Sequence, residues 1–169
     1  MGMAVGWAGG VPDSRVGAIA PISGEMSLFT DLLDDVTIPV FLLGGTLDTS
    51  VPITENDLGF SLIPDNVYQA DIVGATHTHF ANICSFADFL FGLGYEVADW
   101  PGLGAGGLIE PYNDTCTPGV FPIDEAIRIQ NLYVVSFFKK YLMNDASYDT
   151  YLTETYALAN EPDVNFKAK

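Results

Sequence analysis

One continuous apolar run at residues 39–43, Pro-Val-Phe-Leu-Leu, ends at the pair Gly44-Gly45 and restricts the fold more than any other feature. A short run without polar residues is typical of a strand that is covered on both faces. Val16–Ala20 is a similar run between turn residues, and Val67–Val73 is a third, more alternating one. Because helical segments separate these runs, the sequence predicts an α/β fold with helices on both faces of a parallel sheet.

Four segments between and after these runs are predicted to be helical. They are Ser27–Asp35, with Ser27 as its N-cap, then Pro52–Leu62, His79–Phe91 and Ile123–Leu142. The segment Gly92–Gly119 is rich in glycine and proline and is predicted to be a long loop or lid. No repeat or linker divides the chain, so residues 1–169 are expected to form a single domain.

Composition excludes several classes of protein. Hydrophobic residues make up 49% of the chain and charged residues 17%, which argues against disorder. Six Lys and Arg oppose 22 Asp and Glu, and the resulting charge of −16 repels phosphate, so no nucleic-acid partner is expected. No apolar run approaches the roughly 20 residues that span a bilayer. Met1–Gly10 lacks the basic start of a signal peptide, so no export signal is expected in this chain.

Asp48 and His77 follow the ends of two consecutive predicted strands. In a parallel α/β sheet, ligands bind beyond the carboxyl ends of the strands, so the two side chains can converge on one rim. An Asp that accepts a hydrogen bond from a His fixes the His tautomer and stabilises the imidazolium formed during acyl transfer. An acid followed by a histidine late in the chain is the order found in α/β-hydrolases.

Several segments resemble one group of α/β-hydrolases, the dienelactone-hydrolase-like and platelet-activating-factor-acetylhydrolase-like bacterial esterases. The similar segments are VFLLGGTLDTSVP around the triad aspartate, IVGATHTHFANIC around the histidine, IDEAIRIQNLYVVSFFKKYL as the closing helix, and DSRVGAIAPISG as the strand after the nucleophile helix. Gly2–Gly10 is similar to the tail of that nucleophile helix. The resemblance implies the last three parallel strands of an α/β-hydrolase sheet with their flanking helices.

The resemblance also implies hydrolysis of a small carboxylic ester through a Ser-His-Asp triad, with Asp48 as the acid, His77 as the base and no cofactor. The family's serine lies in a G-x-S-x-G elbow, which this sequence lacks. Ser23 is followed by Gly24 but preceded by Pro21-Ile22. The chain alone is therefore expected to be inactive. The alternative is a non-catalytic truncated or split-gene module that pairs with another chain.

Several residues near these motifs have two interpretations. His79 is expected to line the pocket, but a placement shifted by two residues would make it the base. The pair His77 and His79 could also bind a metal with Cys84 and Asp88, although no metal is expected.

Glu25 and Met26 follow the first predicted strand and could line the acyl pocket. The simpler interpretation of Glu25 is an exposed loop acid.

The two cysteines, Cys84 and Cys116, could form a disulfide or be two separate buried thiols. The resembling group is implied to be exported, and the Gly-rich loop between the cysteines needs anchoring, so a disulfide is predicted. In the complete fold the strand Val16–Ala20 would have a second neighbour. Without it, this sheet edge is expected to be open, and the chain is expected to self-associate or to need an upstream fragment.

Overall fold

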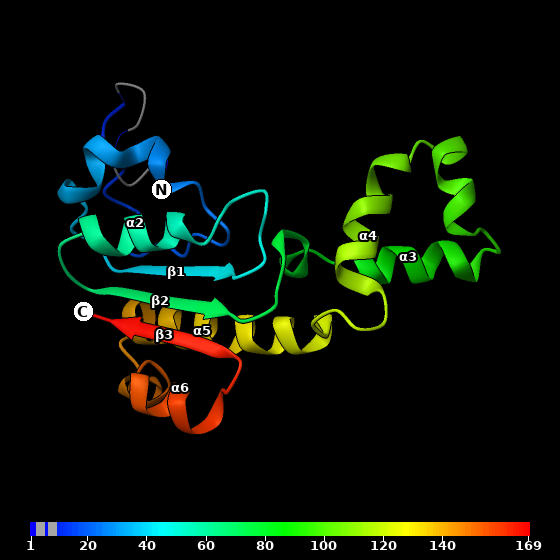
Figure 1. Cartoon of the computed structure of the whole chain (residues 1–169). Helices are drawn as coiled ribbons and strands as arrows, with labels where there is room; N and C mark the ends of the chain where they lie inside the picture. The colour runs from blue at the N-terminus through cyan, green and yellow to red at the C-terminus, as the bar shows by residue number, and fades with distance from the viewer. Residues whose placement is uncertain (3–5, 7–9) are drawn as a thin grey trace.

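The computed structural model describes residues 1, 2, 6 and 10–169, and its centre is a three-stranded sheet between helices (Figure 1). Strands β1 (Val40–Gly45) and β2 (Val67–Ile72) are parallel, and β3 (Val164–Ala168) pairs with β2 in the antiparallel direction. The strand order is β1-β2-β3. The protein is therefore an α/β protein with a mixed sheet. No helix in the described part of the chain is long and apolar enough to cross a membrane.

Strands β1 and β2 are buried along their whole length because helices cover both faces of the sheet. Helix α2 (Thr54–Leu62) lies on one face and α5 (Ile123–Met143) on the other (Figure 1). Successive side chains of β1 point to opposite faces, so Val40 and Leu42 join the core under α2, whereas Phe41 and Leu43 join the core under α5. The continuous apolar pattern of the predicted strand follows from this double coverage.

The core beneath α5 is largely aromatic. Phe41 from β1 lies 5.9 Å from the ring of Tyr133 on α5, and Tyr133 lies 5.2 Å from Phe166 on β3. These rings come from distant parts of the sequence, and their packing holds β3 and α5 against the sheet.

The predicted strand Val16–Ala20 is not a continuous strand in the structure. Parallel pairing with β1 is limited to two bridges, Ile19 with Val40 and Ile22 with Leu43. Pro21 between them explains the interruption, because its carbonyl accepts from Leu43 N–H but it has no N–H to donate. The prediction that this segment lies next to β1 is thus correct, whereas the prediction of a continuous strand with these bounds is wrong.

The expectation of three parallel strands also missed β3. Val164 and Phe166 of β3 reach the core, whereas Asn165, Lys167 and Ala168 are exposed. The connection from α5 to β3 consists of the 3-10 helix η6 (Ala146–Tyr151) and helix α6 (Glu154–Asn160). An antiparallel partner for β2 is available because the chain returns beneath the sheet before it enters β3 (Figure 1).

Two predicted helices have different bounds in the structure. The segment predicted at Ser27–Asp35 is the 3-10 helix η2 (Met26–Asp35), and Ser27 is not its N-cap: the Ser27 amide donates to the Glu55 carboxylate at 2.7 Å. The helix predicted at His79–Phe91 divides into the 3-10 helix η3 (His77–Phe80) and α3 (Ile83–Gly92), separated by extended backbone at Ala81. The other two predicted helices match α2 and α5.

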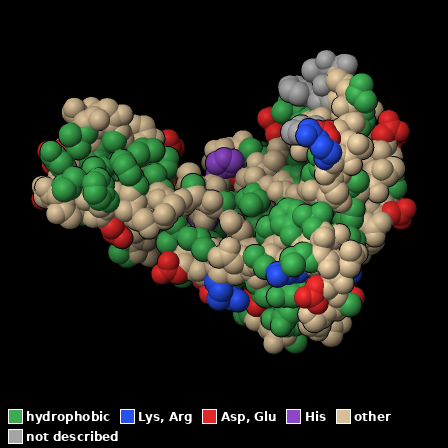
Figure 2. All heavy atoms as spheres, turned by 180° about the vertical axis from the view of Figure 1, so that it is seen from behind, with side chains coloured by type: hydrophobic (Ala, Val, Ile, Leu, Met, Phe, Trp, Pro, Cys, Tyr) green, Lys and Arg blue, Asp and Glu red, His purple; other side chains and the backbone are tan. Residues whose placement is uncertain are grey.

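The segment Gly92–Gly119, predicted as a long loop or lid, is mostly helical. It contains η4 (Val97–Leu103), η5 (Gly106–Leu108) and α4 (Ile109–Cys116). Together with α3 these elements form a lobe, residues 83–116, that projects from the sheet domain (Figures 1 and 2). Burial of apolar side chains inside the lobe outweighs the weak helical propensity of glycine.

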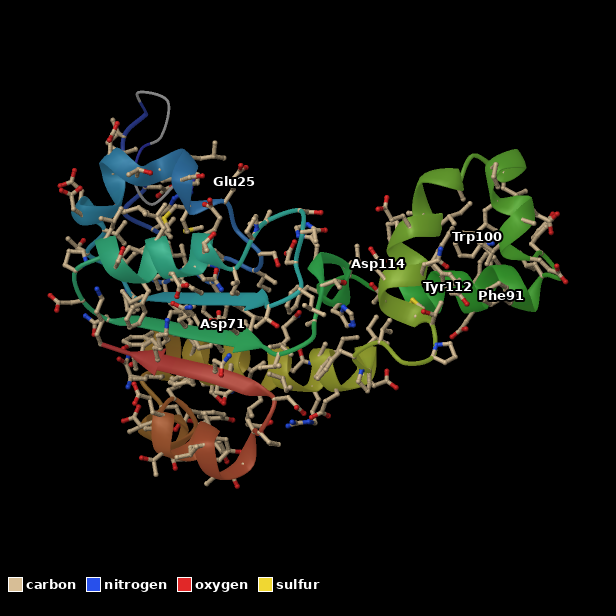
Figure 3. All side chains as sticks on the ribbon, viewed as in Figure 1. Glu25, Asp71, Phe91, Trp100, Tyr112 and Asp114 are labelled. Carbon is tan, nitrogen blue, oxygen red and sulfur yellow. A yellow bond between two sulfur atoms is a disulfide. The ribbon has the colours of Figure 1, made fainter. Side chains whose placement is uncertain are left out.

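The lobe has a small core of its own around Trp100, which is fully buried with Ala87 and Leu90. Figure 3 shows Phe91, Trp100 and Tyr112 facing one another inside the lobe, and the Trp100 and Tyr112 rings are 5.3 Å apart. The predicted disulfide between Cys84 and Cys116 is confirmed, with Cα atoms 5.5 Å apart. It joins the start of α3 to the end of α4 and closes the base of the lobe.

Most of Gly2–Gly10, the segment similar to the tail of a nucleophile helix, lies outside the described residues.

Removing the disulfide is expected to loosen the lobe and leave the sheet intact. By the chain-entropy relation, a loop with a sequence separation of 32 residues is stabilised by about 3–4 kcal/mol. A Cys84→Ala/Cys116→Ala variant should therefore exchange the amide hydrogens of α3 and α4 faster, with β1 and β2 unchanged. Hydrogen exchange read by mass spectrometry measures this. Equal loss of protection in the sheet would show that the lobe and the sheet unfold as one unit.

Within the described residues, no further strand pairs with the segment 18–22 on the side away from β1. In the part of the chain that the structure describes, the backbone amides of Ala18, Ala20 and Ile22 have no hydrogen-bond partner. Beside this edge, α5 carries an apolar groove of about 230 Å³, which includes Val135 and Leu142. Leu142 also lies against Gly17, so the groove and the edge adjoin. Such a surface is a template for association.

We expect the isolated chain to self-associate through this edge. Ala20→Pro removes one unpaired donor without removing a hydrogen bond seen in the structure, and it should shift the molecule toward monomer. Light scattering during size-exclusion chromatography, over a tenfold range of protein concentration, measures the change. A sharp monomer of the unchanged protein at every concentration would contradict the expectation.

Candidate functional site

The site is built where the loops after β1 and β2 touch. Gly45 ends β1 so close to the next loop that a Cβ there would lie 2.2 Å from the Ala75 carbonyl oxygen. The Leu47 amide donates to that same carbonyl at 2.9 Å. In the other direction, the Gly74 amide donates to the Thr46 hydroxyl at 3.0 Å. Glycine at position 45 therefore allows the two loops to be bonded together at the carboxyl edge of the sheet.

Asp48 lies on the first of these loops, and its carboxylate is held by backbone amides. Its side chain is 1% exposed. One oxygen, Oδ1, accepts from the amides of Ser50 at 2.9 Å and Val51 at 2.8 Å. This local turn fixes the carboxylate in one orientation and leaves Oδ2 free to accept another hydrogen bond.

His77 lies on the second loop and reaches that remaining oxygen. Its Nδ1 is 2.9 Å from Asp48 Oδ2, and its side chain is 43% exposed. An ionised carboxylate can only accept, so Nδ1 carries the proton and Nε2 keeps a lone pair. No described residue forms a hydrogen bond with Nε2. The structure thus brings Asp48 and His77 together, and a histidine held in this way can take a proton from a nucleophile and return it to a leaving group.

A cavity of about 130 Å³ lies beside His77. The two loops line one side of it with Thr49, Ser50, Thr76 and Thr78, and α4 lines the other with Glu110, Pro111 and Asp114. Figure 3 shows Asp114 on the face of α4 that is turned toward the loops, and Figure 2 shows a histidine at the recess between lobe and sheet domain.

Thr78 holds the α4 wall of the cavity in place. Its hydroxyl contacts the hydroxyl of Thr115 and the carbonyl of Pro111. The disulfide lies immediately after Thr115, so the wall is anchored next to the base of the lobe. The sequence did not lead to a prediction of this cavity wall. Its spacing could have indicated it, because Glu110 and Asp114 are four residues apart and therefore share one face of a helix.

His79 has a structural position. Its side chain is fully buried, and its Nδ1 accepts from the Thr76 amide at 2.9 Å. Its Nε2 is 2.8 Å from the Phe121 carbonyl, to which it donates. Both ring nitrogens are therefore occupied, which leaves neither available as a base.

The other predicted site residues lie away from this cavity. Met26 is buried in the core beneath α2, and Glu25 is exposed beside the start of η2 (Figure 3). Neither lines the cavity beside His77. Among the described residues, no group of three or more His, Cys, Asp and Glu side chains could hold a metal ion.

A second buried carboxyl, Asp71 on β2, lies beneath α2 outside this cavity (Figure 3). It accepts from Asn56 Nδ2 at 3.1 Å and from Gln69 Nε2 at 2.8 Å. Burial raises the pKa of Asp71 above its ordinary value, and these two hydrogen bonds only partly oppose the effect. Asp57 nearby has a lowered pKa because Lys167 and Gln69 donate to it.

No family model matches the chain, and no curated protein matches it either.

Asp71 should make the protein less stable as pH rises. Its raised pKa means that the folded state binds the proton more tightly than the unfolded chain does. Its contribution to stability is therefore present below about pH 3.9, the ordinary value of the unfolded chain, and is lost as pH rises through the folded pKa. Relative to the unchanged protein, Asp71→Asn should gain unfolding free energy between about pH 4 and 7. Urea unfolding across this range measures the difference.

Asp57→Asn is the matched control for this measurement. Because the folded pKa of Asp57 is lowered, its stabilising contribution is lost as pH falls, and the difference should have the opposite slope. A pH-independent difference for Asp71→Asn would contradict the expectation.

Proposed function

We propose that this chain is the C-terminal part of a serine carboxylic-ester hydrolase of the α/β-hydrolase type. One observation carries the proposal, the hydrogen bond from His77 Nδ1 to Asp48 Oδ2. Both residues follow neighbouring parallel strands, in the chain order of that class. The resemblance of the segments around them to dienelactone-hydrolase-like and platelet-activating-factor-acetylhydrolase-like esterases supports the same function.

In this proposal the chain contributes the acid and the base of the triad. A serine hydroxyl next to His77 Nε2 would lose its proton to the imidazole as its oxygen attacks the ester carbonyl. The imidazolium is stabilised by Asp48 and then protonates the leaving alcohol, and water repeats the cycle on the acyl-enzyme. The reaction needs no metal or organic cofactor. The cavity of about 130 Å³ favours a small ester.

The nucleophile is proposed to come from a segment outside this sequence. The sequence contains no G-x-S-x-G elbow, and Ser50, which lines the cavity, forms no hydrogen bond with His77 in the described structure. The open edge at residues 18–22 is where another strand could pair, so a nucleophile-bearing segment could complete the sheet there.

A second candidate function is supported by the same open edge and missing elbow. A non-catalytic module could use the edge to pair with another chain while the Asp48–His77 pair remains unused. The two candidates differ in whether an in-frame elbow is encoded immediately upstream of Met1.

Without a nucleophile, the purified chain should show no turnover of p-nitrophenyl acetate beyond weak histidine catalysis. Loss of the oxyanion donors alone removes about 3–4 kcal/mol of transition-state stabilisation. A fluorophosphonate probe should label no serine, and Ser50→Ala should behave like the unchanged chain. Multiple turnover that His77→Ala abolishes, together with a labelled Ser50, would show that the chain supplies its own nucleophile.

Coexpression with the polypeptide encoded directly upstream should restore activity. In that complete protein, Asp48→Asn should lower kcat by about 10⁴-fold because the imidazole loses its correct tautomer. Stopped-flow or steady-state kinetics of ester hydrolysis measure the decrease in kcat. If Asp48→Asn retains full activity, or if the upstream sequence encodes no elbow, the hydrolase proposal fails and the binding module remains.

A further inference from the structure

The short 3-10 helix η3 carries His77, and its other residues are held from two sides. Figure 1 shows this turn between the carboxyl ends of β1 and β2 and the base of the lobe. Extended backbone precedes the turn at Thr76 and follows it at Ala81. Because a 3-10 helix of four residues has little stability of its own, the contacts of its side chains decide how the turn is rotated.

The first restraint comes from the sheet domain. The side chain of His79 is fully buried, and its two ring nitrogens form hydrogen bonds with the Thr76 amide at 2.9 Å and the Phe121 carbonyl at 2.8 Å. The rings of His79 and Phe121 also meet edge to face, with their centroids 6.1 Å apart. Phe121 lies just before the start of α5, so His79 ties one side of the turn to the segment that enters this helix.

The second restraint comes from the lobe. The Thr78 hydroxyl contacts the hydroxyl of Thr115, which is buried near the end of α4. In the described part of the chain, the hydrogen bonds between α4 and the sheet domain are those of Thr78, with Thr115 and with the Pro111 carbonyl. Threonine is branched at Cβ, so both hydroxyls are restricted to few rotamers. Cys116 follows Thr115 and is bonded to Cys84, so the disulfide holds the residue that contacts the turn.

Two fixed side chains set the direction of the third. Successive side chains of a 3-10 helix point roughly 120° apart, because the helix has three residues per turn. With Thr78 held by the lobe and His79 held by the sheet domain, the turn cannot rotate about its axis. His77 must then point in the remaining direction, toward Asp48. Its side chain is 43% exposed, and its hydrogen bond in the described structure is the one with Asp48.

We propose that Thr78 and Thr115 are positioning residues for His77, through which the disulfide-closed lobe keeps the imidazole on Asp48. In this role both threonines act through His77 and not on a substrate. Loss of their contact leaves the turn held from the sheet side only, so the turn can rotate and the hydrogen bond between His77 and Asp48 becomes weaker.

The proposal gives the lobe a second task besides forming a wall of the cavity. A catalytic group that is misplaced by about 1 Å can lower the rate by about 100-fold. The lobe would therefore be needed for ester hydrolysis although it supplies no member of the triad. This use of the restraint rests on the proposed function, whereas the restraint itself is a property of the chain and can be measured without turnover.

Nuclear magnetic resonance of the full chain tests the proposal, because His77 and His79 are its two histidines. The hydrogen bonds of an imidazole set which ring nitrogen carries the proton, and the nitrogen chemical shifts report that tautomer. At about pH 9, where free histidine is neutral, His77 should carry its proton on Nδ1 and His79 on Nε2. Thr115→Val should lower the ratio of Nδ1–H to Nε2–H at His77 by about threefold or more, because one hydrogen bond that restrains the turn is lost. The tautomer of His79 should not change.

Two variants serve as controls. Thr115→Ser keeps the hydroxyl and should give His77 the same tautomer as in the unchanged chain. Thr117→Val is matched to Thr115→Val in chemistry and location, but the hydroxyl that it removes donates to the Asn113 carbonyl at 2.7 Å and not to the turn. It should leave the tautomer of His77 unchanged.

Two further variants remove the same restraint in other ways, which keeps the test decisive if Thr115→Val disturbs the packing of the lobe. Thr78→Val removes the contact from the side of the turn and should have the same effect. Thr78→Val/Thr115→Val should have no larger effect than either substitution alone, since both act on one contact. Cys84→Ala/Cys116→Ala should also lower the ratio at His77, although it keeps both hydroxyls.

The proposal is wrong if His77 keeps its tautomer in both Thr115→Val and Thr78→Val, or if Thr117→Val has the same effect as these variants. It is also wrong if His79 changes together with His77, because that result would indicate general loosening. A proton on Nε2 of His77 in the unchanged chain would overturn both this inference and the proposed function, since the hydrogen bond with Asp48 would then be absent. The lack of an upstream elbow would end the hydrolase proposal alone and leave the positioning of His77 intact.

Discussion

The contact between Gly45 and the Ala75 carbonyl is the constraint on which the candidate site depends. Parallel strands end at the same edge of a sheet, but side chains on the following loops meet only if the loops approach each other closely. Here the backbone of one loop is bonded to the carbonyl of the other, with no room for a Cβ at position 45. Asp48 and His77 are carried on these joined loops, so their geometry is set by backbone contacts and needs no flexible side chain to adjust.

Much of this arrangement could be predicted from local patterns. The run at 39–43 predicted β1 because burial on both faces leaves only apolar residues in a strand. Asp48 and His77 could be paired from the sequence because each follows such a strand. The prediction of the disulfide, in contrast, was based on a resemblance. The sequence alone left two free thiols as an equal alternative.

The remaining features depend on contacts between distant residues. Strand β3 escaped prediction because its pairing with β2 is decided by aromatic packing of Phe166 against Phe41 and Tyr133. The lobe was predicted as a loop because its glycines and prolines are visible in the sequence, whereas burial of Trp100 is visible only in the structure. The role of His79 was also hidden, because its partner, the carbonyl of Phe121, lies far along the chain.

The antiparallel pairing of β2 with β3 has a consequence for the order of folding. Strand β2 acquires its second neighbour only after the lobe, α5 and α6 have been synthesised, since all of them precede residue 164. Until then, the backbone hydrogen-bonding groups along one side of β2 have no strand partner. The aromatic core beneath the sheet also lacks Phe166. Contacts between residues so distant in sequence form slowly, because a long loop must close before they contribute. The lobe, with its local contacts and its own small core, can fold first, so the nascent chain would carry a formed helical lobe beside an unfinished sheet.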